Sequence, residues 1–544
     1  MVAQQAVVTE QSARPTFVVR HRSALLAAGG GAVSALATPP TDLYPCMIVG
    51  LAMLAFAMRD SPRFRHGFLI GWLWGAVGQL VGMRFVPSVI TLFTDLGVAA
   101  ALLAHLLLSA AQSLHWALGI GAAVALRRRV GAPLELAFAA GMLIAVSLPS
   151  IFVWTPAGLL SPWPVLVQSA ELIGERGTSV LFAVIAALCV RGIDDVRRHG
   201  ATRRVTRSGL LAFGGAAALL VAMLAHGAWA MSRFHAGEHE ARIALIHGAV
   251  DPRARWEGKN WSKILSELRR QTAFAEAGGV ELSVWPEAAY PYALPHGAKV
   301  APRGQRGLLG GTVQGPILFG LIMTERPERL PDGAWHRDSY NSASIVMPDG
   351  TLQPSYDKME LLWFGETVPL GEQIPWLKRT FQRSGGLIRG TELRGLTVER
   401  DGKEPLRMAV LNCYEDTLPT LGRRMLRELQ PNLLVNVTND AWFIGTAEPE
   451  LHARLGAMRS IELRRDLVRA VNLGVSGWID AAGRVQARSA SGEPDWMLVT
   501  PTLRNDPPTI YARAGDIPMW TALLLGVGAC AWNRRRSGRA PPTV

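Results

Sequence analysis

Three short polar clusters follow apolar runs in the C-terminal half of the chain, and their residue types suit nucleophilic catalysis. The clusters contain Glu287, Lys358 and Cys413. A thiol attacks a carbonyl group only after a base has taken its proton, and a carboxylate serves as that base where desolvation raises its pKa. A nearby ammonium group then stabilises the anionic tetrahedral intermediate. If strands bring them together, these three side chains supply the base, the ammonium group and the nucleophile.

Cys413 differs from the other three cysteines in its surroundings. Cys46, Cys189 and Cys530 fall in long apolar runs, so Cys413 has no disulfide partner in the polar part of the chain. A buried free cysteine that packs as a small hydrophobic residue is the alternative interpretation. The neighbouring candidates for base and ammonium group favour a nucleophile.

Between Glu238 and Asp516 the sequence alternates short β-rich runs with helical patterns. Several runs are continuously apolar, as strands buried on both faces must be. The expected strands are Arg242–Val250, Val280–Trp285, Ile317–Met323, Ser342–Met347, Leu406–Leu411 and Leu433–Val437. Trp261–Ala275 and Glu450–Arg465 have helical periodicity. This alternation predicts an α/β sandwich with its active residues at strand ends.

The composition indicates that much of the remaining chain lies in lipid. Of the 544 residues, 49% are hydrophobic and 18% are charged, which excludes a disordered or fibrous protein. A helix crosses a bilayer with about 20 apolar residues. Eight spans are predicted, near residues 23–41, 43–58, 67–86, 97–126, 131–154, 178–190, 208–231 and 517–532. The fourth and seventh runs contain no Asp, Glu, Lys or Arg, whereas the second and sixth are short.

Arginine clusters beside the predicted spans account for the formal net charge of +13. They fall at every second loop and contain Arg14, Arg20, Arg22, Arg59, Arg63, Arg65, Arg127, Arg128, Arg129, Arg191, Arg197, Arg198, Arg203, Arg204, Arg207, Arg534, Arg535, Arg536 and Arg539. Lys and Arg near span ends are retained on the cytoplasmic side. The charge therefore reports membrane topology, and we expect no nucleic-acid partner. Both termini are predicted inside, with the polar region outside.

The first apolar run has a second interpretation as a cleavable signal peptide. Arg20 and Arg22 precede the apolar residues Ala24–Leu36, and small residues follow. Pro39 and Pro40 disfavour processing, and the second run continues at once. The later spans keep their orientation under either interpretation.

The sequence around the three candidate residues resembles a known catalytic site. Glu287 in WPEAAYP, Lys358 in YDKMELLWFGETVP and Cys413 in LNCYED, in this chain order, are similar to the Glu-Lys-Cys triad of the nitrilase superfamily. Other motifs resemble one branch of it, the bacterial apolipoprotein N-acyltransferases. These motifs are Leu36–Pro45 (LATPPTDLYP), Thr438–Phe443 (TNDAWF), His452, Arg459–Gly477 and Tyr511–Pro518 (YARAGDIP). The resemblance covers nearly the whole chain.

The resemblance implies a polytopic α-helical membrane domain of about eight spans and a soluble α/β nitrilase-like domain, an α-β-β-α sandwich. We expect the N-terminal membrane domain in residues 1–232, the catalytic domain in 240–508, a last spanning helix in 516–533 and a cytoplasmic basic tail in 534–544. The implied location is the bacterial inner membrane. Both termini would lie in the cytoplasm and the catalytic domain would face the periplasm.

The implied reaction moves an acyl chain from a phospholipid, expected to be phosphatidylethanolamine, onto Cys413 as a thioester. The chain then passes to the α-amino group of a diacylglyceryl-cysteine lipoprotein, as the last step of lipoprotein maturation. The resemblance makes Glu287 the general base and Lys358 the oxyanion stabiliser. A two-step acyl transfer needs a covalent carrier and one reusable base, so no cofactor and no metal are expected.

The resemblance also marks supporting and substrate-binding positions. They are Glu366, Tyr414, Glu415, Trp256, Asn439 and Trp442. The sequence departs from the family pattern where Ile444 is inserted after TNDAWF and where Asn472–Gly474 replaces a more polar triplet. These departures touch expected substrate loops, so they concern lipid preference more than chemistry.

Two other functions remain open. A membrane-tethered amidase would use the same triad with water as acceptor, and a non-catalytic nitrilase-like module would scaffold a membrane glycosyltransferase. The intact triad argues against the scaffold, and the predicted spans argue against an amidase for soluble substrates. His235, Glu238 and His239 fit an inverted zinc-protease motif, but a solvated linker accounts better for a glycine-containing segment beside a span.

Overall fold

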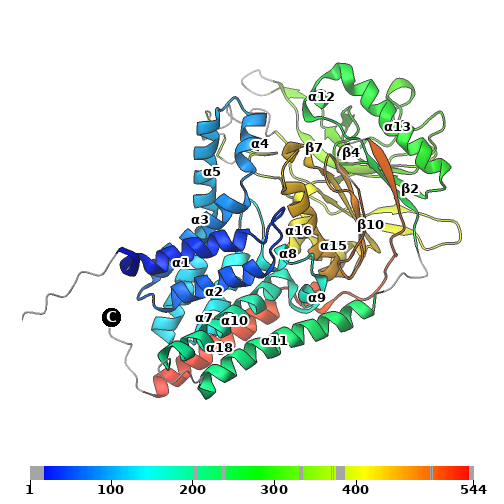
Figure 1. Cartoon of the computed structure of the whole chain (residues 1–544). Coiled ribbons are helices and arrows are strands. Elements are labelled where there is room, and N and C mark those ends of the chain that lie inside the picture. Colours follow the sequence, from blue (N-terminus) through cyan, green and yellow to red (C-terminus); the bar gives the residue numbers. More distant parts are fainter. Residues whose placement is uncertain are drawn as a thin grey trace, which may run out of the picture.

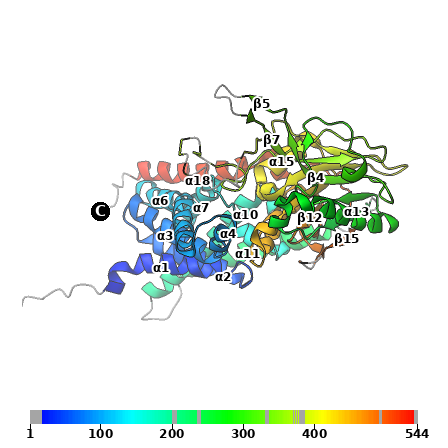
Figure 2. The same cartoon turned by 90° about the horizontal axis from the view of Figure 1, so that it is seen from above.

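The long apolar runs form helices in the computed structural model, and the β-rich runs form two large sheets that lie beside them (Figure 1, Figure 2). A small third sheet pairs β5 (Glu328–Arg329) with β6 (Trp335–His336). The structure describes residues 17–537 except 200–205, 235–239, 330–334, 369, 372, 375, 377–385, 490–491 and 493. The first helix begins and the last helix ends on the side of the helical region that faces away from the sheets (Figure 1).

The helical region is built mainly from long apolar helices. They are α1 (Phe17–Ala35), α2 (Pro45–Arg59), α3 (Phe64–Gly82), α4 (Val86–Phe93), α5 (Val98–Gln112), α6 (Leu114–Ala125), α7 (Leu134–Ser147), α10 (Ala170–Arg198), α11 (Arg207–Ser232) and α18 (Ile517–Arg536), with the short α8 (Pro156–Leu159) and α9 (Pro164–Val167) between α7 and α10. Each of the eight predicted runs overlaps one of these helices or a consecutive pair of them.

Two helical stretches among the described residues are long and apolar enough to cross a membrane. They are Val98–Val130 and Arg207–Ser232, which correspond to the fourth and seventh predicted runs. A third candidate, Phe64–Gly82 with Val86–Leu92, is bent by 58° at its break. Helices Pro45–Arg59 and Leu134–Ser147 are apolar but shorter.

Two predicted runs have wrong boundaries. The run near 131–154 is helical only to the end of α7, because Pro149 disfavours helical backbone at Leu148. The run near 178–190 is part of the longer α10, which extends in both directions beyond it. Gly174 interrupts α10 with a φ of 74°, which separates the first turn of the helix from the remainder.

The sheets have parallel centres and antiparallel edges. The first follows the order β15 (Asp495–Val499), β1 (Ile243–His247), β2 (Leu282–Val284), β4 (Ile317–Thr324), β7 (Ser339–Val346) and β8 (Tyr356–Asp357), with β3 (Leu294–Pro295) paired to β4. The second follows the order β14 (Val485–Arg488), β13 (Gly477–Ile479), β12 (Leu467–Asn472), β11 (Leu433–Asn439), β10 (Leu406–Asn412) and β9 (Leu396–Val398). All six predicted strands are present.

Helices cover the outer faces of both sheets. One hydrophobic core joins the sheets and contains, for example, Leu245 of β1 and Val410 of β10. Helix α13 (Trp261–Ala277) packs through a separate core on the other face of the first sheet. Helices α15 (Pro419–Leu429) and α16 (Glu448–Leu463) pack on the second sheet. The layers therefore follow the predicted α-β-β-α order.

Buried ion pairs join α16 to the helical region. Nη2 of Arg459 lies 2.6 Å from Oε2 of Glu175, and Nε of Arg464 lies 2.9 Å from Oε2 of Glu171. All four residues are buried, and both glutamates belong to the first turns of α10. Because a buried charge is stable only with a partner, these contacts fix α16 against α10.

Candidate active site

Glu287 lies in the turn after β2, where the chain passes closely over β4. N of Gly320 donates a 3.2 Å hydrogen bond to the carbonyl oxygen of Pro286. A Cβ atom on Gly320 would lie 2.4 Å from N of Ala288, so this close approach requires glycine. Glu287 is only 8% exposed. The turn therefore presents a largely desolvated carboxylate, which a general base for a thiol requires.

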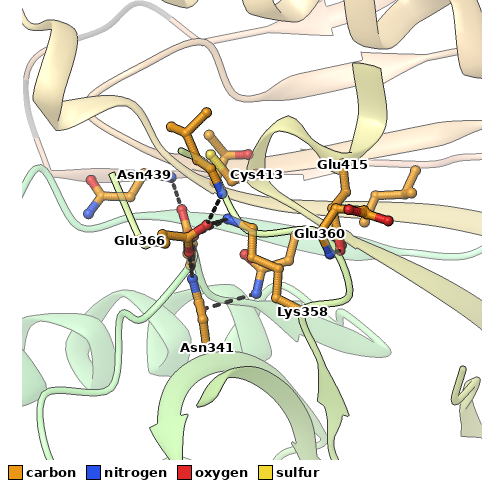
Figure 3. A network of polar contacts seen from close by, with 12 residues as sticks. Asn341, Lys358, Glu360, Glu366, Cys413, Glu415 and Asn439 are labelled. Carbon is orange, nitrogen blue, oxygen red and sulfur yellow. Dashed lines mark hydrogen bonds and ion pairs between the residues drawn. The ribbon is translucent and has the colours of Figure 1, made fainter. Parts of the chain in front are cut away.

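Lys358 directly follows β8, and its ammonium group contacts two carboxylates. Nζ lies 2.8 Å from Oε2 of Glu366 and 3.3 Å from Oε1 of Glu287 (Figure 3). The Lys358 side chain is buried. Burial alone would lower the pKa of Lys358, but the carboxylates of Glu287 and Glu366 outweigh it and raise the pKa well above its ordinary value. Lys358 therefore provides a permanent positive charge.

Cys413 follows β10 and begins the 3-10 turn Cys413–Thr417. Its φ of 55° lies in the left-handed region, which residues other than glycine rarely adopt. Nδ2 of Asn436 donates a 2.9 Å hydrogen bond to the Cys413 carbonyl oxygen and helps to hold this conformation. Burial raises the pKa of the Cys413 thiol well above its ordinary value; Glu287 adds to the rise and Lys358 opposes it. At neutral pH the group is therefore a thiol, which could act as a nucleophile only if a base took its proton.

Asn341 of β7 connects the two carboxylates. Its Nδ2 donates hydrogen bonds to Oε1 of Glu287 at 2.6 Å and to Oε1 of Glu366 at 2.8 Å. Its Oδ1 accepts a 3.1 Å hydrogen bond from Nδ2 of Asn412. Asn341, Glu366 and Lys358 lie side by side (Figure 3). The sequence analysis missed Asn341. The available signal was a carboxamide directly before the predicted strand Ser342–Met347, because its polar atoms need partners if the strand continues through it.

Glu415 ties the turn of the nucleophile to the loop after Lys358. Its carboxylate accepts hydrogen bonds from the backbone N–H groups of Asn412, Met359 and Glu360, at 2.8, 2.8 and 3.0 Å, and from the hydroxyl group of Tyr356 at 2.7 Å. Desolvation raises the pKa of Glu415 to about 7, and Lys358 and these hydrogen bonds oppose the rise. Glu415 therefore holds together the backbone that precedes Cys413 and the backbone that follows Lys358.

The three aromatic candidates lie in different turns and helices of the structure. The ring centroid of Tyr414 lies 5.5 Å from Nζ of Lys358, so the ring covers the ammonium group. Trp442 lies in the 3-10 turn Asp440–Phe443, and the inserted Ile444 that follows is exposed. Trp256 ends the short helix α12 (Pro252–Trp256), and its side chain lies outside the described residues.

Asn439 holds the carboxylate of Glu287 from the side opposite to Asn341. Its backbone N donates a 2.9 Å hydrogen bond to Oε2 of Glu287, whose Oε1 receives the bonds of Asn341 and Lys358. Nδ2 of Asn472 donates a 2.9 Å hydrogen bond to Oδ1 of Asn439. Asn472, one of the departures from the family pattern, is thus connected to the candidate base through one residue.

A buried charged cluster adjoins the turn of the nucleophile. His452 of α16 lies between Asp416, 3.0 Å from its Nε2, and Asp440, 3.1 Å from its Nδ1. Arg469 pairs with Asp416 as well. Desolvation alone would lower the pKa of His452, but the two aspartates raise it to about 10. A permanently charged imidazolium therefore holds together the turn of Cys413 and the loop after Asn439.

The histidines of the inverted zinc-protease motif, His235 and His239, lie outside the described residues. Within the part of the chain that the structure describes, no group of three His, Cys, Asp or Glu residues has the geometry of a metal site.

Two protein families match separate parts of the chain. Residues 30–188 match the family described as Apolipoprotein N-acyltransferase N-terminal domain. Residues 242–503 match the family described as Carbon-nitrogen hydrolase. The first segment corresponds to most of the helical region and the second to both sheets.

Curated proteins named apolipoprotein N-acyltransferase are similar to the chain over almost its full length. The one from Bradyrhizobium diazoefficiens is 30% identical, and the match covers 96% of each chain. The one from Azotobacter vinelandii is 30% identical over 95% of this chain and 96% of its own. Among solved structures, a mutant nitrilase-superfamily amidase from Nesterenkonia AN1 matches 53% of this chain and 99% of its own, with 17% identity and a TM-score of 0.35.

Proposed function

The chain belongs to the apolipoprotein N-acyltransferase family, an acyltransferase family of lipoprotein maturation, and we propose that Glu287, Lys358 and Cys413 carry out its reaction through a cysteine thioester. The observation that supports these roles is the position of the Lys358 ammonium between Glu287 and Glu366, in one buried site with Cys413. The supporting roles of the other predicted residues are part of the same proposal.

The first half-reaction acylates the enzyme. Glu287 takes the proton of the Cys413 thiol, and the sulfur attacks the carbonyl carbon of an ester in the donor lipid. Lys358 compensates the negative charge that forms on the carbonyl oxygen. When the carbon–oxygen ester bond breaks, the leaving glycerol oxygen takes the proton from Glu287, and the acyl chain stays on sulfur as a thioester.

The second half-reaction transfers the acyl chain to the lipoprotein. The neutral α-amino nitrogen of the diacylglyceryl-cysteine attacks the thioester carbon while Glu287 takes a proton from that nitrogen. Lys358 again faces the developing oxyanion. The carbon–sulfur bond breaks, the sulfur takes the proton back from Glu287, and an amide is formed. We propose phosphatidylethanolamine as the donor and a diacylglyceryl lipoprotein as the acceptor.

We further propose that the helical region crosses the bacterial inner membrane eight times, with both termini in the cytoplasm and the sheets in the periplasm. The domains are 1–232, 240–508 and 516–533, followed by the basic tail 534–544. Residues of all five arginine clusters gather in the structure, which supports a common cytoplasmic side. The ring of Phe56 is surrounded by the guanidinium groups of Arg22, Arg59 and Arg197. Arg128 donates a hydrogen bond to the carbonyl oxygen of Ser61. Arg534 donates hydrogen bonds to the carbonyl oxygens of Arg128 and Arg129.

Acyl transfer by the purified protein in detergent tests the function. The protein is incubated with acyl-labelled phosphatidylethanolamine and a diacylated lipopeptide. We expect label on the enzyme first and then on the peptide amine. Cys413→Ala should abolish both, whereas Cys46→Ala, in α2, should abolish neither. A labelled acyl-enzyme in the Cys413→Ala variant would refute the assignment of the nucleophile.

The same experiment separates transfer from hydrolysis. Label that reaches the enzyme but leaves only as free fatty acid would make water the acceptor, as in an amidase-like hydrolase. No labelling of the wild-type enzyme would contradict the proposed donor.

A further inference from the structure

The proposed steps leave one positive charge beside Glu287 unused. Arg255 of α12 lines a cleft together with Glu287, Asn439 and Asn472. The space in this cleft that protein atoms do not fill is about 270 Å³, its open mouth included. Arg255 itself is half-buried. The cleft is narrow, and it places a cation next to the candidate base.

The backbone around Arg255 is held in place on both sides. Oδ1 of Asp251 accepts hydrogen bonds from N of Arg253 at 2.8 Å and from N of Ala254 at 3.2 Å, which caps α12. Nε1 of Trp261 donates a 2.8 Å hydrogen bond to the carbonyl oxygen of Arg255. The arginine is thus presented from a fixed turn.

The loop that leads to Arg255 is also tied to the active site. Oδ1 of Asn472 accepts a 2.8 Å hydrogen bond from N of Val250, and Nδ2 of Asn472 donates a 2.9 Å hydrogen bond to the Val250 carbonyl oxygen. The same Nδ2 contacts Asn439, whose N–H holds Glu287. The position of Arg255 relative to the base is therefore set through Asn472.

The guanidinium group of Arg255 has donors to spare. Within the described parts of the chain it forms no ion pair, and Glu287 is the charged group whose field acts on it. Burial lowers the pKa of Arg255 to about 10, and Glu287 opposes this, so the group remains charged at neutral pH. Glu287 already receives hydrogen bonds from Asn341 and Asn439. A planar guanidinium group with free donors suits a doubly hydrogen-bonded oxyanion such as a phosphate.

We propose that Arg255 binds the phosphodiester of the phospholipid donor, an inference that rests on the proposed function. In the first half-reaction the leaving glycerol oxygen must lie beside Glu287, because Glu287 returns the proton to it. Only the carbons of one glycerol unit separate this oxygen from the phosphate. The phosphate must therefore lie close to Glu287 but apart from Lys358, which faces the carbonyl oxygen. Arg255 occupies such a position.

The charge of the site gives a second reason for this assignment. Glu287 and Glu366 share the single ammonium group of Lys358. A phosphodiester brings a further negative charge, which two carboxylates would repel. Arg255 offsets that charge. The acceptor carries its lipid on a thioether and has no phosphate, so Arg255 acts in the first half-reaction and not in the second.

The test compares two acyl donors in the full-length enzyme. Acylation of Cys413 is measured with a phospholipid and with a p-nitrophenyl ester of the same fatty acid, which lacks phosphate. In Arg255→Gln the ratio of kcat/KM for the phospholipid to that for the ester should fall about tenfold to a hundredfold, through KM, because a hydrogen bond to a charged group is lost. Arg255→Lys should recover part of the ratio. Arg253→Gln, exposed on the same short helix, is the matched control for charge.

Three results would overturn the proposal. An equal loss of kcat/KM with both donors would mean that Arg255 acts on Glu287 or on the fold. An unchanged ratio of the two kcat/KM values, with no loss for either donor, would exclude phosphate binding. Inhibition of the wild-type enzyme by inorganic phosphate that Arg255→Gln abolishes, while the ratio for the two donors stays unchanged, would indicate a site for a free anion instead. Transfer from a preformed acyl-enzyme to the lipopeptide should be as fast in Arg255→Gln as in the wild type. If the wild-type enzyme takes acyl groups from the ester but not from the phospholipid, the proposed donor fails, which is a separate outcome.

Discussion

Nδ2 of Asn412 donates a 3.1 Å hydrogen bond to Oδ1 of Asn341, and this contact joins the two sheets at the active site. Asn412 ends β10 of the second sheet and precedes Cys413, whereas Asn341 lies on β7 of the first sheet and holds Glu287. The candidate nucleophile and the candidate base therefore come from different sheets and are kept in register by a pair of carboxamides.

Asn341→Ala should slow acylation of Cys413 by about tenfold to a hundredfold, because Glu287 and Glu366 each lose a hydrogen bond to a charged group. The rate of labelled acyl-enzyme formation measures this effect. Ser344→Ala, which removes a buried hydrogen bond from the same strand away from the site, is the control for stability. A normal rate in Asn341→Ala would show that Lys358 and Asn439 position the carboxylates without it.

His452 should make stability depend on pH above neutrality. Its pKa is raised from 6.5 to about 10 in the folded protein, so its stabilising contribution is fully present below pH 6.5 and decreases as the pH rises from 6.5 through 10. The size of the effect is on the order of a few kcal/mol. This pH dependence is measured by thermal unfolding in detergent, in the wild type and in His452→Gln. The pH range from about 6 to about 10 spans the unfolded and folded pKa values of His452. His452→Gln should be less stable than the wild type at pH 6, and its stability should no longer fall with rising pH. An unchanged dependence of stability on pH would contradict the charged imidazolium.

Asp42, in the loop between α1 and α2, should be energetically coupled to Arg454 of α16. Two hydrogen bonds join them, Nη1 to Oδ1 at 2.7 Å and Nη2 to Oδ2 at 3.1 Å. Since Asp42 is 38% exposed, we expect a coupling energy of only roughly 1 kcal/mol. A double-mutant cycle on thermal stability with Asp42→Ala and Arg454→Ala measures it. Strictly additive losses would show that the contact contributes nothing.

The proposed topology predicts the activity of reporter fusions in cells. Alkaline phosphatase fused near Gly402, in the turn before β10, should be active because it is carried to the periplasm. The same enzyme fused after Arg204 should be silent. The reverse pattern would contradict the orientation inferred from the arginine clusters.

Local signals and the family resemblance singled out Glu287, Lys358 and Cys413, and the strands before Glu287 and Cys413 were predicted, whereas the short β8 before Lys358 was not. Glu287 and Cys413 follow short runs whose apolar character is visible without the fold, and β2, β4, β10 and β11 lie where these runs predicted them. Glu287 and Cys413 follow β2 and β10, which pair in parallel with neighbours in their own sheets, whereas Lys358 follows β8, which is antiparallel to β7. The roles of these residues remain predictions until the variants are measured.

Contacts between distant segments could not be predicted in the same way. Asn341 has its role only because β7 lies next to β8 and opposite the end of β10. Glu171 and Arg464 are far apart in the sequence, and each alone suggests a charged surface residue. The predicted end of α7 was wrong because the apolar pattern continues across Pro149. The predicted start of α10 was wrong because polar residues around Gly174 do not resemble part of a spanning helix.

The ion pairs between α10 and α16 have a consequence for any attempt to isolate the catalytic part. A fragment that spans about residues 240–508 would keep Arg464 but lose its partner Glu171. It would also expose apolar side chains of α16 that pack in the core of the helical region, namely Leu451, Leu455, Met458 and Ile461. A buried guanidinium group without its carboxylate partner destabilises a folded protein. A newly exposed apolar patch promotes aggregation. The sheets are therefore not an independent module that the membrane helices merely tether. A water-soluble version of this enzyme would require polar substitutions on the face of α16 that packs against the helical region.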